Sequence, residues 1–369
     1  MSPETVAKLK ALRVALSSAR VDAAMFWHRN NFAWLTGGAD NHILHAGPVG
    51  VACLLVTPDR LVCLCDTIES PRFRDEELAG LEIEVIDYPW YDPGAGKRVA
   101  QEILENRKFA ADFDAYQLGA LPIPQAVADL RLTLNEQELE RYRIGGRLAA
   151  EALEAACRSI KPSMTEHQIA AEIDREVRNR GAKAVVNLVA VDHRIDQFRH
   201  PIPTDTRLKK VAMLVVCSEK FGLISNVTRF VHFGKVPAEL VAKVQAVADI
   251  DATVNLATKP GRSWKDIFAQ LTAAYERAGY ADQWKFHHQG GSTGYAGREA
   301  FINPTHANIV LDRQAYAWNP SVVGFKSEDT LFVTRDKGVE VLTAHSKNWP
   351  TVVGHAPSGE LARAGVLER

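Results

Sequence analysis

The fold is decided by two segments, KPSMTEHQIAAEIDREVRNRG at residues 161–181 and KPGRSWKDIFAQLTAAYERAG at residues 259–279. Their Lys-Pro pairs stand 98 residues apart, and the same interval separates Ile169 from Ile267 and the two closing glycines. Apolar residues recur at helical spacing in both segments, and each ends in the residue that most often stops a helix. We therefore predict a duplicated structural unit; a chance spacing of generic helix signals is the alternative.

Each copy is predicted to be a capped amphipathic helix followed by a strand. Thr165 and Ser263 take equivalent positions at the starts of the two helices, and each has a polar residue three positions later. The strands that follow are Ala184–Val191 in the first copy and Trp284–His288 in the second. Two such halves would face each other, and a cleft between them is the default binding site.

The first third of the chain has the pattern of a smaller α/β domain, with an amphipathic helix at Lys8–Ala19. Short apolar runs separated by turn residues predict strands at Ala23–Trp27, Phe32–Leu35, Val49–Val56, Leu61–Cys65, Ile83–Tyr88 and Phe109–Phe113. The spacing of Thr133 and Glu136 predicts a capping box that opens a long helix. We place the domain boundary near residue 133, which gives an α/β (α+β) chain with domains at 1–133 and 134–369.

Composition limits the classes of function. The 369 residues carry 44 Lys and Arg against 45 Asp and Glu, and 46% are hydrophobic, so the chain is globular and offers no basic surface for nucleic acid. No apolar run approaches the roughly 18 residues of a membrane span, and the polar, charged N-terminal segment does not resemble a signal peptide. Five cysteines, an odd number without C-x-x-C spacing, favour a reducing, cytoplasmic location.

Three polar clusters could carry chemistry: FRHPIP at 198–203, FHHQGGSTGYAGRE at 286–299 and WNPSVVGFKSEDT at 318–330. A histidine near a carboxylate is the minimum equipment for proton transfer near pH 7. Each signal is weak alone, because a single histidine is more often structural and Arg298-Glu299 is more often a surface or structural ion pair.

Together and in order, these motifs resemble the pita-bread superfamily of creatinase, aminopeptidase P, prolidase and methionine aminopeptidase. The motifs that carry the likeness are HPIP at 200–203, NVTR at 226–229, HHQGG at 287–291, GREA at 297–300, NP at 319–320 and SEDT at 327–330. The resemblance covers nearly the whole chain, and GREA is particularly similar to creatinase. It implies a creatinase-type N-terminal domain over 1–133 and a pita-bread catalytic domain over 134–369.

In the peptidases of this superfamily, two Asp, one His and two Glu hold a pair of metal ions. The resemblance places His288 and Glu328 at two of these five positions. Asn226 replaces the second Asp, and Asn319 replaces the first Glu. The first Asp falls within the segment 215–218 (Val-Val-Cys-Ser), which holds no carboxylate.

Two neighbouring divalent ions repel strongly, and anionic ligands are what make such a pair tolerable. Because three of the four carboxylates are replaced, we expect no metal cofactor. A single divalent ion, held through a substitute ligand such as Glu219 or His287, is the alternative.

Creatinase also lacks a metal centre, so the resemblance implies hydrolysis of a C–N bond by a histidine and carboxylates. His200 matches the creatinase histidine and is the candidate general base and acid; Glu328 would hold or polarise the substrate, and His288 would share the proton transfer or bind substrate. The substrate-binding candidates are Asn226, Asn319, Arg298, Tyr295 and Arg229. Thr228 stands where creatinase has its second carboxylate, so creatine itself is a poor match.

The sequence thus predicts a metal-independent hydrolase that cleaves a C–N bond of a small amide, amidine or peptide-like substrate by histidine acid–base catalysis. The alternatives are a metal-dependent Xaa-Pro aminopeptidase or dipeptidase with an altered metal centre, and a non-catalytic ligand- or peptide-binding protein on the same fold. The expected partners are a small molecule or short peptide and a second copy of the chain in a homodimer. The dimer is implied because residues 27–31 (WHRNN) resemble a segment that reaches the neighbouring active site in relatives of creatinase; an ordinary Asn-rich turn is the alternative.

Overall fold

The computed structural model describes residues 1–369, which form two units. Unit 1 contains Met1–Arg131 and Phe221–Leu223, and unit 2 contains Leu132–Lys220 and Ile224–Arg369. Helices and strands occur together in both units, which confirms the predicted α/β (α+β) class. No helix of either unit is both long enough and apolar enough to cross a lipid bilayer.

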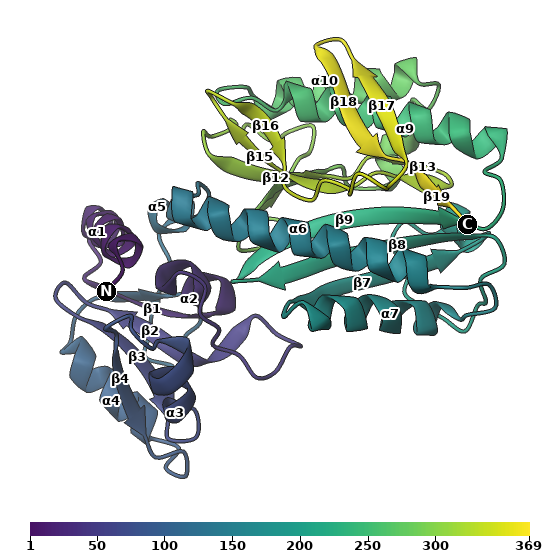
Figure 1. Cartoon of the computed structure of the whole chain (residues 1–369). Coiled ribbons are helices and arrows are strands. Elements are labelled where there is room, and N and C mark those ends of the chain that lie inside the picture. Colours follow the sequence, from purple (N-terminus) through teal and green to yellow (C-terminus); the bar gives the residue numbers. More distant parts are fainter. The chain divides into compact units, whose positions relative to one another are not determined.

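Unit 1 is built on a six-stranded mixed sheet with the strand order β4-β3-β2-β1-β5-β6 (Figure 1). The pairs β1–β2 and β2–β3 are antiparallel, whereas β3–β4, β1–β5 and β5–β6 are parallel. The strands are β1 (Ala23–His28), β2 (Val49–Val56), β3 (Leu61–Asp66), β4 (Glu84–Tyr88), β5 (Phe109–Ala111) and β6 (Leu121–Pro122). Strands β1 to β5 confirm five of the six strands predicted for this region.

The helices of unit 1 are α1 (Pro3–Ser18), α2 (Arg29–Thr36), α3 (Ser70–Arg72), α4 (Ala95–Leu104) and α5 (Gln125–Ala128), with single turns at Phe73–Glu77 and Asp129–Arg131. The prediction of a strand at Phe32–Leu35 is wrong, because these residues lie in α2. So short an apolar run fits a buried strand and a buried helix equally well. Gly37, with φ of 77°, ends the helix in the left-handed conformation that glycine adopts without strain.

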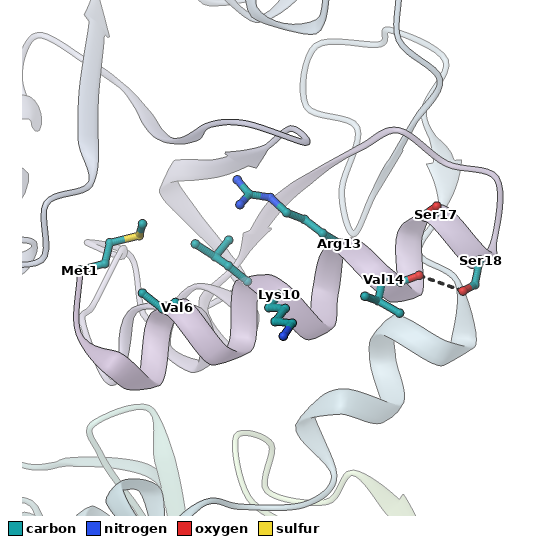
Figure 2. Close-up of a pocket in the computed structure, with 8 residues that line it drawn as sticks. Met1, Val6, Lys10, Arg13, Val14, Ser17 and Ser18 are labelled. Atoms are coloured by element: carbon teal, nitrogen blue, oxygen red, sulfur yellow. Dashed lines mark hydrogen bonds between the residues drawn. The ribbon is translucent and has the colours of Figure 1, made fainter.

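Helix α1 begins at Pro3 rather than at the predicted Lys8, because the Ser2 side chain caps it by accepting a hydrogen bond from the Thr5 backbone N–H. Its outer face borders a shallow hollow of about 510 Å³ (Figure 2). The lining includes Arg13 and Val14 but no histidine, cysteine or carboxylate. This hollow therefore lacks the side chains that usually bind metal ions.

The helices of unit 2 are α6 (Glu136–Ser159), α7 (Glu166–Asn179), α8 (Arg194–Gln197), α9 (Ala238–Ala257) and α10 (Trp264–Arg277), with a 3-10 turn at Gln283–Phe286. The capping box of α6 is formed by Asn135 and Glu138, two residues beyond the predicted pair Thr133 and Glu136. Both pairs have the required spacing. The later one is used because the Leu134 backbone N–H donates to the Arg313 carbonyl oxygen, outside the helix.

The strands of unit 2 are β7 (Lys183–Val191), β8 (Val211–Lys220), β9 (Leu223–His232), β10 (Gly290–Thr293), β11 (Ala300–Phe301), β12 (Gln314–Trp318), β13 (Ser321–Val322), β14 (Phe325–Lys326), β15 (Asp329–Thr334), β16 (Gly338–Val341), β17 (Thr351–Ala356), β18 (Gly359–Ala364) and β19 (Val366–Glu368). They form two larger sheets, with the orders β19-β9-β8-β7 and β11-β10-β12-β15-β16. Two hairpins, β13–β14 and β17–β18, complete the unit.

The repeat predicted from the sequence recurs in unit 2. Helices α7 and α10 begin after Thr165 and Ser263, whose side chains accept hydrogen bonds from first-turn backbone N–H groups. The preceding helices, α6 and α9, end at Ser159 and Ala257, which are again 98 residues apart. Figure 1 shows α6 and α7 alongside strands β7, β8 and β9, which form the sheet of the first copy.

Both faces of that sheet are buried, because successive side chains of a strand point to opposite faces. In β8, Leu214 and Val216 pack in one core with residues of α6 and α7. Met213 and Val215 belong instead to the core that contains α9 and α10. The first sheet therefore lies between its own helices and the second copy, and it can carry a binding site on its inner face.

The prediction of a strand at Trp284–His288 is wrong in its position. Residues 283–286 form the 3-10 turn, His287 and His288 lie in the connection, and strand β10 begins at Gly290. Gly290 is required by its neighbours, because a Cβ atom there would lie 2.0 Å from the Ala317 carbonyl oxygen, and its φ is +99°. These glycines thus serve strand packing, where the sequence suggested close approach to a ligand.

We expect Gly290→Ala to destabilise the protein strongly, since it adds a methyl group against backbone and strains a left-handed conformation. The combined cost is about 2–5 kcal/mol, or a fall in Tm of roughly 5–15 °C by thermal denaturation. Gly47→Ala is the matched control, because a Cβ atom at Gly47 meets nothing within 4 Å. Equal Tm values for the two variants would contradict the packing described here.

Candidate active site

A cavity of about 370 Å³ opens in unit 2 on the inner face of the first sheet. One wall is apolar, and its residues are Val186, Leu188, Val215 and Phe301. The polar lining consists of His200, Cys217, Asn226, His288, Arg298, Asn319, Lys326 and Glu328. A concave site with an apolar wall and a few convergent polar groups has the usual character of a small-molecule site.

The alternation of side chains along strands β8 and β9 brings both apolar and polar residues to this cavity. Val215 and Cys217 are two residues apart in β8, so both side chains leave the sheet on its inner face. Asn226 and Thr228 are related in the same way in β9. Most of the other polar groups come from connections: His200 follows α8, His288 precedes β10 and Arg298 precedes β11. Asn319 follows β12, Lys326 ends β14, and Glu328 precedes β15.

Glu328 is the only carboxylate among the residues that line the cavity, and it is bonded to two cations. Its Oε1 lies 2.9 Å from Arg298 Nη2, and its Oε2 lies 3.1 Å from Lys326 Nζ. Thr228 Oγ1 donates to Oε2 at 2.9 Å. Burial by itself would raise the pKa of Glu328, but Lys326 and Arg298 outweigh it and hold that pKa well below its usual range. The carboxylate is therefore ionised, and its two oxygens are already engaged.

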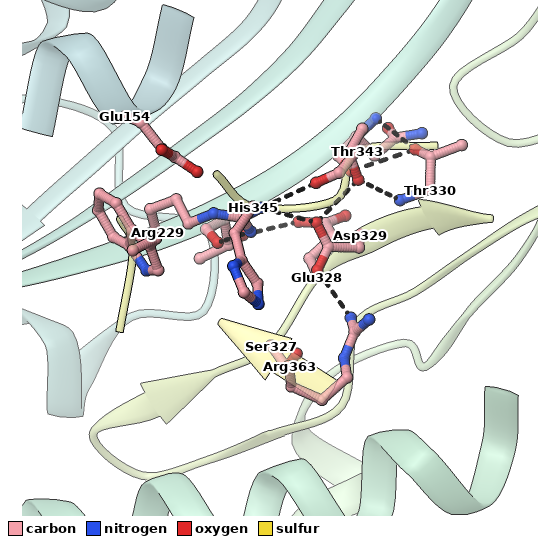
Figure 3. Close-up of polar contacts among 12 residues, drawn as sticks. Glu154, Arg229, Ser327, Glu328, Asp329, Thr330, Thr343, His345 and Arg363 are labelled. Atoms are coloured by element: carbon pink, nitrogen blue, oxygen red, sulfur yellow. Dashed lines mark hydrogen bonds and ion pairs between the residues drawn. The ribbon is translucent and has the colours of Figure 1, made fainter. Parts of the chain in front are cut away.

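A second buried network fixes the peptide segment that carries Glu328 (Figure 3). Asp329 pairs with Arg229 at 3.0 Å and with Arg363 at 2.8 Å, and it accepts a hydrogen bond from Thr343 Oγ1. Ser327 Oγ donates to Asp251, which also pairs with Arg363. Two buried carboxylates are thus matched by two buried guanidinium groups, as buried charges require.

Three imidazoles converge beside Glu328. His287 Nε2 lies 3.1 Å from His200 Nε2, and ring nitrogens of His200, His287 and His288 all lie within 4.8 Å of one another. His287 Nδ1 lies 3.2 Å from the Asn319 carbonyl oxygen. A carbonyl oxygen can only accept, so Nδ1 of His287 carries the proton and its Nε2 carries a lone pair. His200 Nε2 must then donate to His287, which leaves Nδ1 as the basic nitrogen of His200.

All three imidazoles are held in the neutral form. Removal of the rings from water is the main cause in each case, although His200 is more exposed than His287 and His288, and nearby cations add to it. The pKa of His287 falls to about 2 and that of His288 to about 4, and the pKa of His200 is lowered as well. Lys326 contributes repulsion in all three cases, and Arg298 contributes at His200 and His288.

The structure brings six of the eight predicted site residues to one cavity: His200, His288, Glu328, Asn226, Asn319 and Arg298. Tyr295 does not line it, because its buried hydroxyl donates to Glu138 Oε1 at 2.9 Å. Arg229 does not line it either, because its guanidinium is turned into the network around Asp329. The side chains of Tyr295 and Arg229 are thus engaged outside the cavity lining, and substrate contact by either residue stays a prediction.

Two groups of this site received no catalytic role from the sequence. Lys326 stands two residues before Glu328, and a cation so close to a candidate carboxylate was the available signal. For His287 the sequence suggests only a substitute metal ligand, and its position next to His288 is the available signal for a role in the site. No sequence pattern shows the hydrogen bond between His287 and His200, which are 87 residues apart along the chain.

The cavity does not fit the five-ligand metal pair of the peptidases that the sequence resembles. Asn226 and Asn319 stand where the resemblance expects carboxylates, and the segment 215–218 offers only Cys217 to the cavity. Burial raises the pKa of Cys217 to about 12, so this thiol is neutral. The remaining carboxylate, Glu328, is bonded to two side-chain cations. The Oδ1 atoms of Asn226 and Asn319 are buried and have no hydrogen-bond partner in the protein, so no protein donor satisfies either acceptor.

Comparison with known proteins identifies the family. Residues 140–335 match metallopeptidase family M24, and residues 8–144 match the creatinase/prolidase N-terminal domain. Because the first match covers more than half of the chain, the protein belongs to metallopeptidase family M24, within a superfamily of hydrolases. This confirms the superfamily indicated by the motifs, together with its creatinase-type N-terminal domain and pita-bread domain.

Individual relatives agree with this assignment. An uncharacterized peptidase of Staphylococcus saprophyticus is 24% identical over 362 residues, which cover 92% of this chain and 100% of the relative. The Xaa-Pro dipeptidase of Bacillus anthracis has a similar structure, with a TM-score of 0.76 and 17% identity over 93% of this chain and 99% of its own. The prolidase of Pyrococcus horikoshii gives the same TM-score, identity and coverage.

We expect Glu328→Gln to destabilise unit 2 by about 3–5 kcal/mol, because it leaves two buried cations without their anion. Glu340→Gln is the matched control, since Glu340 forms a half-exposed pair with Arg143, and its loss should cost no more than about 1 kcal/mol. Denaturant unfolding of both variants measures the difference. A cost at Glu328 no larger than at Glu340 would contradict the described pairing.

The same variant tests the pH dependence of this stabilisation. The pKa of Glu328 in the folded chain lies below its ordinary value of 4.5, so the unfolded chain takes up this proton first as the pH falls. The stabilisation by the ionised carboxylate is therefore full above about pH 5 and declines as the pH falls towards the folded-state pKa. The difference in unfolding free energy between wild type and Glu328→Gln should shrink between about pH 5 and about pH 3, and a constant difference would contradict the shift.

Proposed function

We propose that this protein is a hydrolase that cleaves a C–N bond in a small amide, amidine or peptide-like substrate carrying an anionic group, with His200 as general acid and base and without a metal pair. The observation that carries the proposal is the composition of one cavity. It combines a chain of neutral histidines with two cations and a single, fully engaged carboxylate.

The hydrogen-bond chain from Asn319 through His287 to His200 supports the acid–base role. It directs the Nε2 proton of His200 towards His287 and leaves Nδ1 to accept a proton. In the proposed reaction, His200 Nδ1 takes a proton from a water molecule whose oxygen attacks the substrate carbon. As the C–N bond breaks, the same proton passes to the departing nitrogen. His287 acts as a positioning residue, as the orienting member of a catalytic triad does.

The charge balance supports an anionic substrate. Lys326 and Arg298 bring two positive charges to the cavity, and Glu328 offsets one of them. Arg298 Nε is buried and has no hydrogen-bond partner in the protein, so it is available to donate to a substrate oxygen. A substrate carboxylate would neutralise the remaining charge and satisfy this donor. Glu328 then orients the two cations, and the substrate is polarised by them.

The size and shape of the cavity support a small substrate. A volume of about 370 Å³ lies at the low end of ligand pockets, and one wall is formed by aliphatic and aromatic side chains. The fold neighbours named as an Xaa-Pro dipeptidase and a prolidase favour substrates of dipeptide size. We therefore expect a molecule of about the size of a dipeptide, with an apolar part opposite its carboxylate.

The test is a hydrolysis panel of dipeptides, N-acyl amino acids and guanidino or amidino acids, run on chelator-treated protein. We expect turnover that withstands the chelator and falls by about 10²–10⁴-fold in His200→Ala, because a positioned general base contributes that much. His355→Ala is the control, since His355 is exposed in the β17–β18 hairpin.

The other outcomes separate the alternatives. Turnover that disappears with chelator and returns with a divalent ion would support a metal-dependent Xaa-Pro peptidase. Tight binding of panel compounds without turnover, and with little effect of His200→Ala, would support a non-catalytic binding protein. Either result overturns the proposed mechanism.

A further inference from the structure

We propose that His200, His287 and His288 also form a binding site for one divalent transition-metal ion of the Zn²⁺ type, separate from the five-ligand metal pair that this chain lacks. Of the three histidines, only His288 matches a ligand position of that metal pair. The site is defined by imidazole nitrogens alone, and its ligands come from two distant segments of the chain.

The spacing of the nitrogens fits a tetrahedral ion. With Zn–N bonds of about 2.0–2.1 Å, two ligand nitrogens lie roughly 3.3–3.4 Å apart. His200 Nε2 and His287 Nε2 are 3.1 Å apart, and the third ring brings all the ligand atoms within 4.8 Å. Small rotations of the side chains therefore suffice to place three nitrogens around one ion. The fourth position would hold water, as in open three-histidine zinc sites.

The surroundings of His287 orient it as a ligand. A metal-bound histidine usually donates its other N–H to a carbonyl oxygen, which fixes the tautomer and the ring. His287 Nδ1 does this with the Asn319 carbonyl oxygen at 3.2 Å, and Ser321 Oγ lies 3.4 Å from the same nitrogen. Its Nε2 lone pair points at His200. His287 Nε2, the nitrogen that would bind the ion, thus already carries a lone pair in a fixed ring orientation.

His288 supplies an independent observation. Its Nδ1 is buried and has no hydrogen-bond partner in the protein. A buried polar atom without a partner costs free energy, and a metal ion or a metal-bound water would supply one. Its ring lies beside both other histidines, with centroids 4.6 Å from His287 and 5.3 Å from His200.

The ligand type and the local charge restrict which ion can bind. Neutral imidazoles suit Zn²⁺, Cu²⁺, Ni²⁺ and Co²⁺, whereas Mg²⁺, Ca²⁺ and Mn²⁺ prefer oxygen ligands. Lys326 and Arg298 oppose any cation, although their pairing with Glu328 removes one of the two charges. We therefore expect an affinity lower than that of a structural zinc site.

Occupation of this site would stop the proposed hydrolysis; this consequence, unlike the site itself, rests on the proposed function. To bind the ion, His200 must use the Nε2 atom that now donates to His287, so its remaining proton moves to Nδ1. The nitrogen assigned to proton transfer is then no longer basic. Zn²⁺ would act as an inhibitor that competes with the acid–base chemistry.

The experiment uses chelator-treated full-length protein titrated with Co²⁺, whose visible absorption reports tetrahedral nitrogen coordination, followed by displacement with Zn²⁺. We expect one ion per chain. His287→Ala and His288→Gln should each weaken binding at least about 10-fold, the lower end for disturbing a metal site. His355→Ala is the control, because its exposed imidazole lies outside the cluster. Circular dichroism establishes that the variants are folded.

The outcomes are distinct. Absence of stoichiometric Co²⁺ uptake by the wild-type protein, or uptake that both cluster variants retain, overturns the site. Uptake together with inhibition by Zn²⁺ supports both the site and the proposed function. Uptake together with hydrolysis that requires the ion supports the site and overturns the metal-free mechanism.

Discussion

The cavity depends on one electrostatic constraint: a single buried carboxylate, Glu328, lies between two buried cations. Charges so far removed from water are tolerated only when they are paired and hydrogen-bonded, and Arg298, Lys326 and Thr228 supply those bonds. The next residue, Asp329, anchors the same peptide segment through its own arginine partners. Glu328, which the superfamily pattern assigns as a metal ligand, is therefore held in internal salt bridges, and both of its oxygens are already engaged by Arg298 and Lys326.

The same cations help to keep the histidines neutral. Burial is the main cause of their lowered pKa values, and repulsion by Lys326 and Arg298 adds to it, so the imidazoles keep their lone pairs. A neutral imidazole can accept a proton or bind a transition-metal ion, but one lone pair cannot do both at once. The proposed hydrolysis and the proposed zinc site are therefore competing uses of one set of nitrogens. In both, the chain from Asn319 to His287 determines which nitrogen of His200 is active.

Features that depend on residues close together in the sequence were predictable from it. Features that depend on contacts between residues distant in the sequence were not. The caps at Thr165 and Ser263 and the 98-residue interval predicted the paired helices correctly, because capping and helical spacing are local. The order of the motifs along the sequence correctly predicted that His200, His288 and Glu328 lie in one site. The contact between His200 and His287 and the turning of Arg229 away from the cavity required the fold, because each depends on a partner distant in sequence.

The unpartnered groups narrow the proposed substrate further. The Oδ1 atoms of Asn226 and Asn319 are buried acceptors without donors, while Arg298 Nε is a buried donor without an acceptor. Each such group costs free energy until a ligand satisfies it, so the matching ligand offers N–H groups on one side and an anionic oxygen on another. An amide or amidine with N–H groups at the scissile nitrogen meets this condition. The nitrogen of an Xaa-Pro bond has no N–H, so such a substrate could donate to the asparagine oxygens only through its N-terminal amino group. By this argument Asn226 and Asn319 favour a substrate that offers N–H groups, in keeping with the proposed hydrolysis.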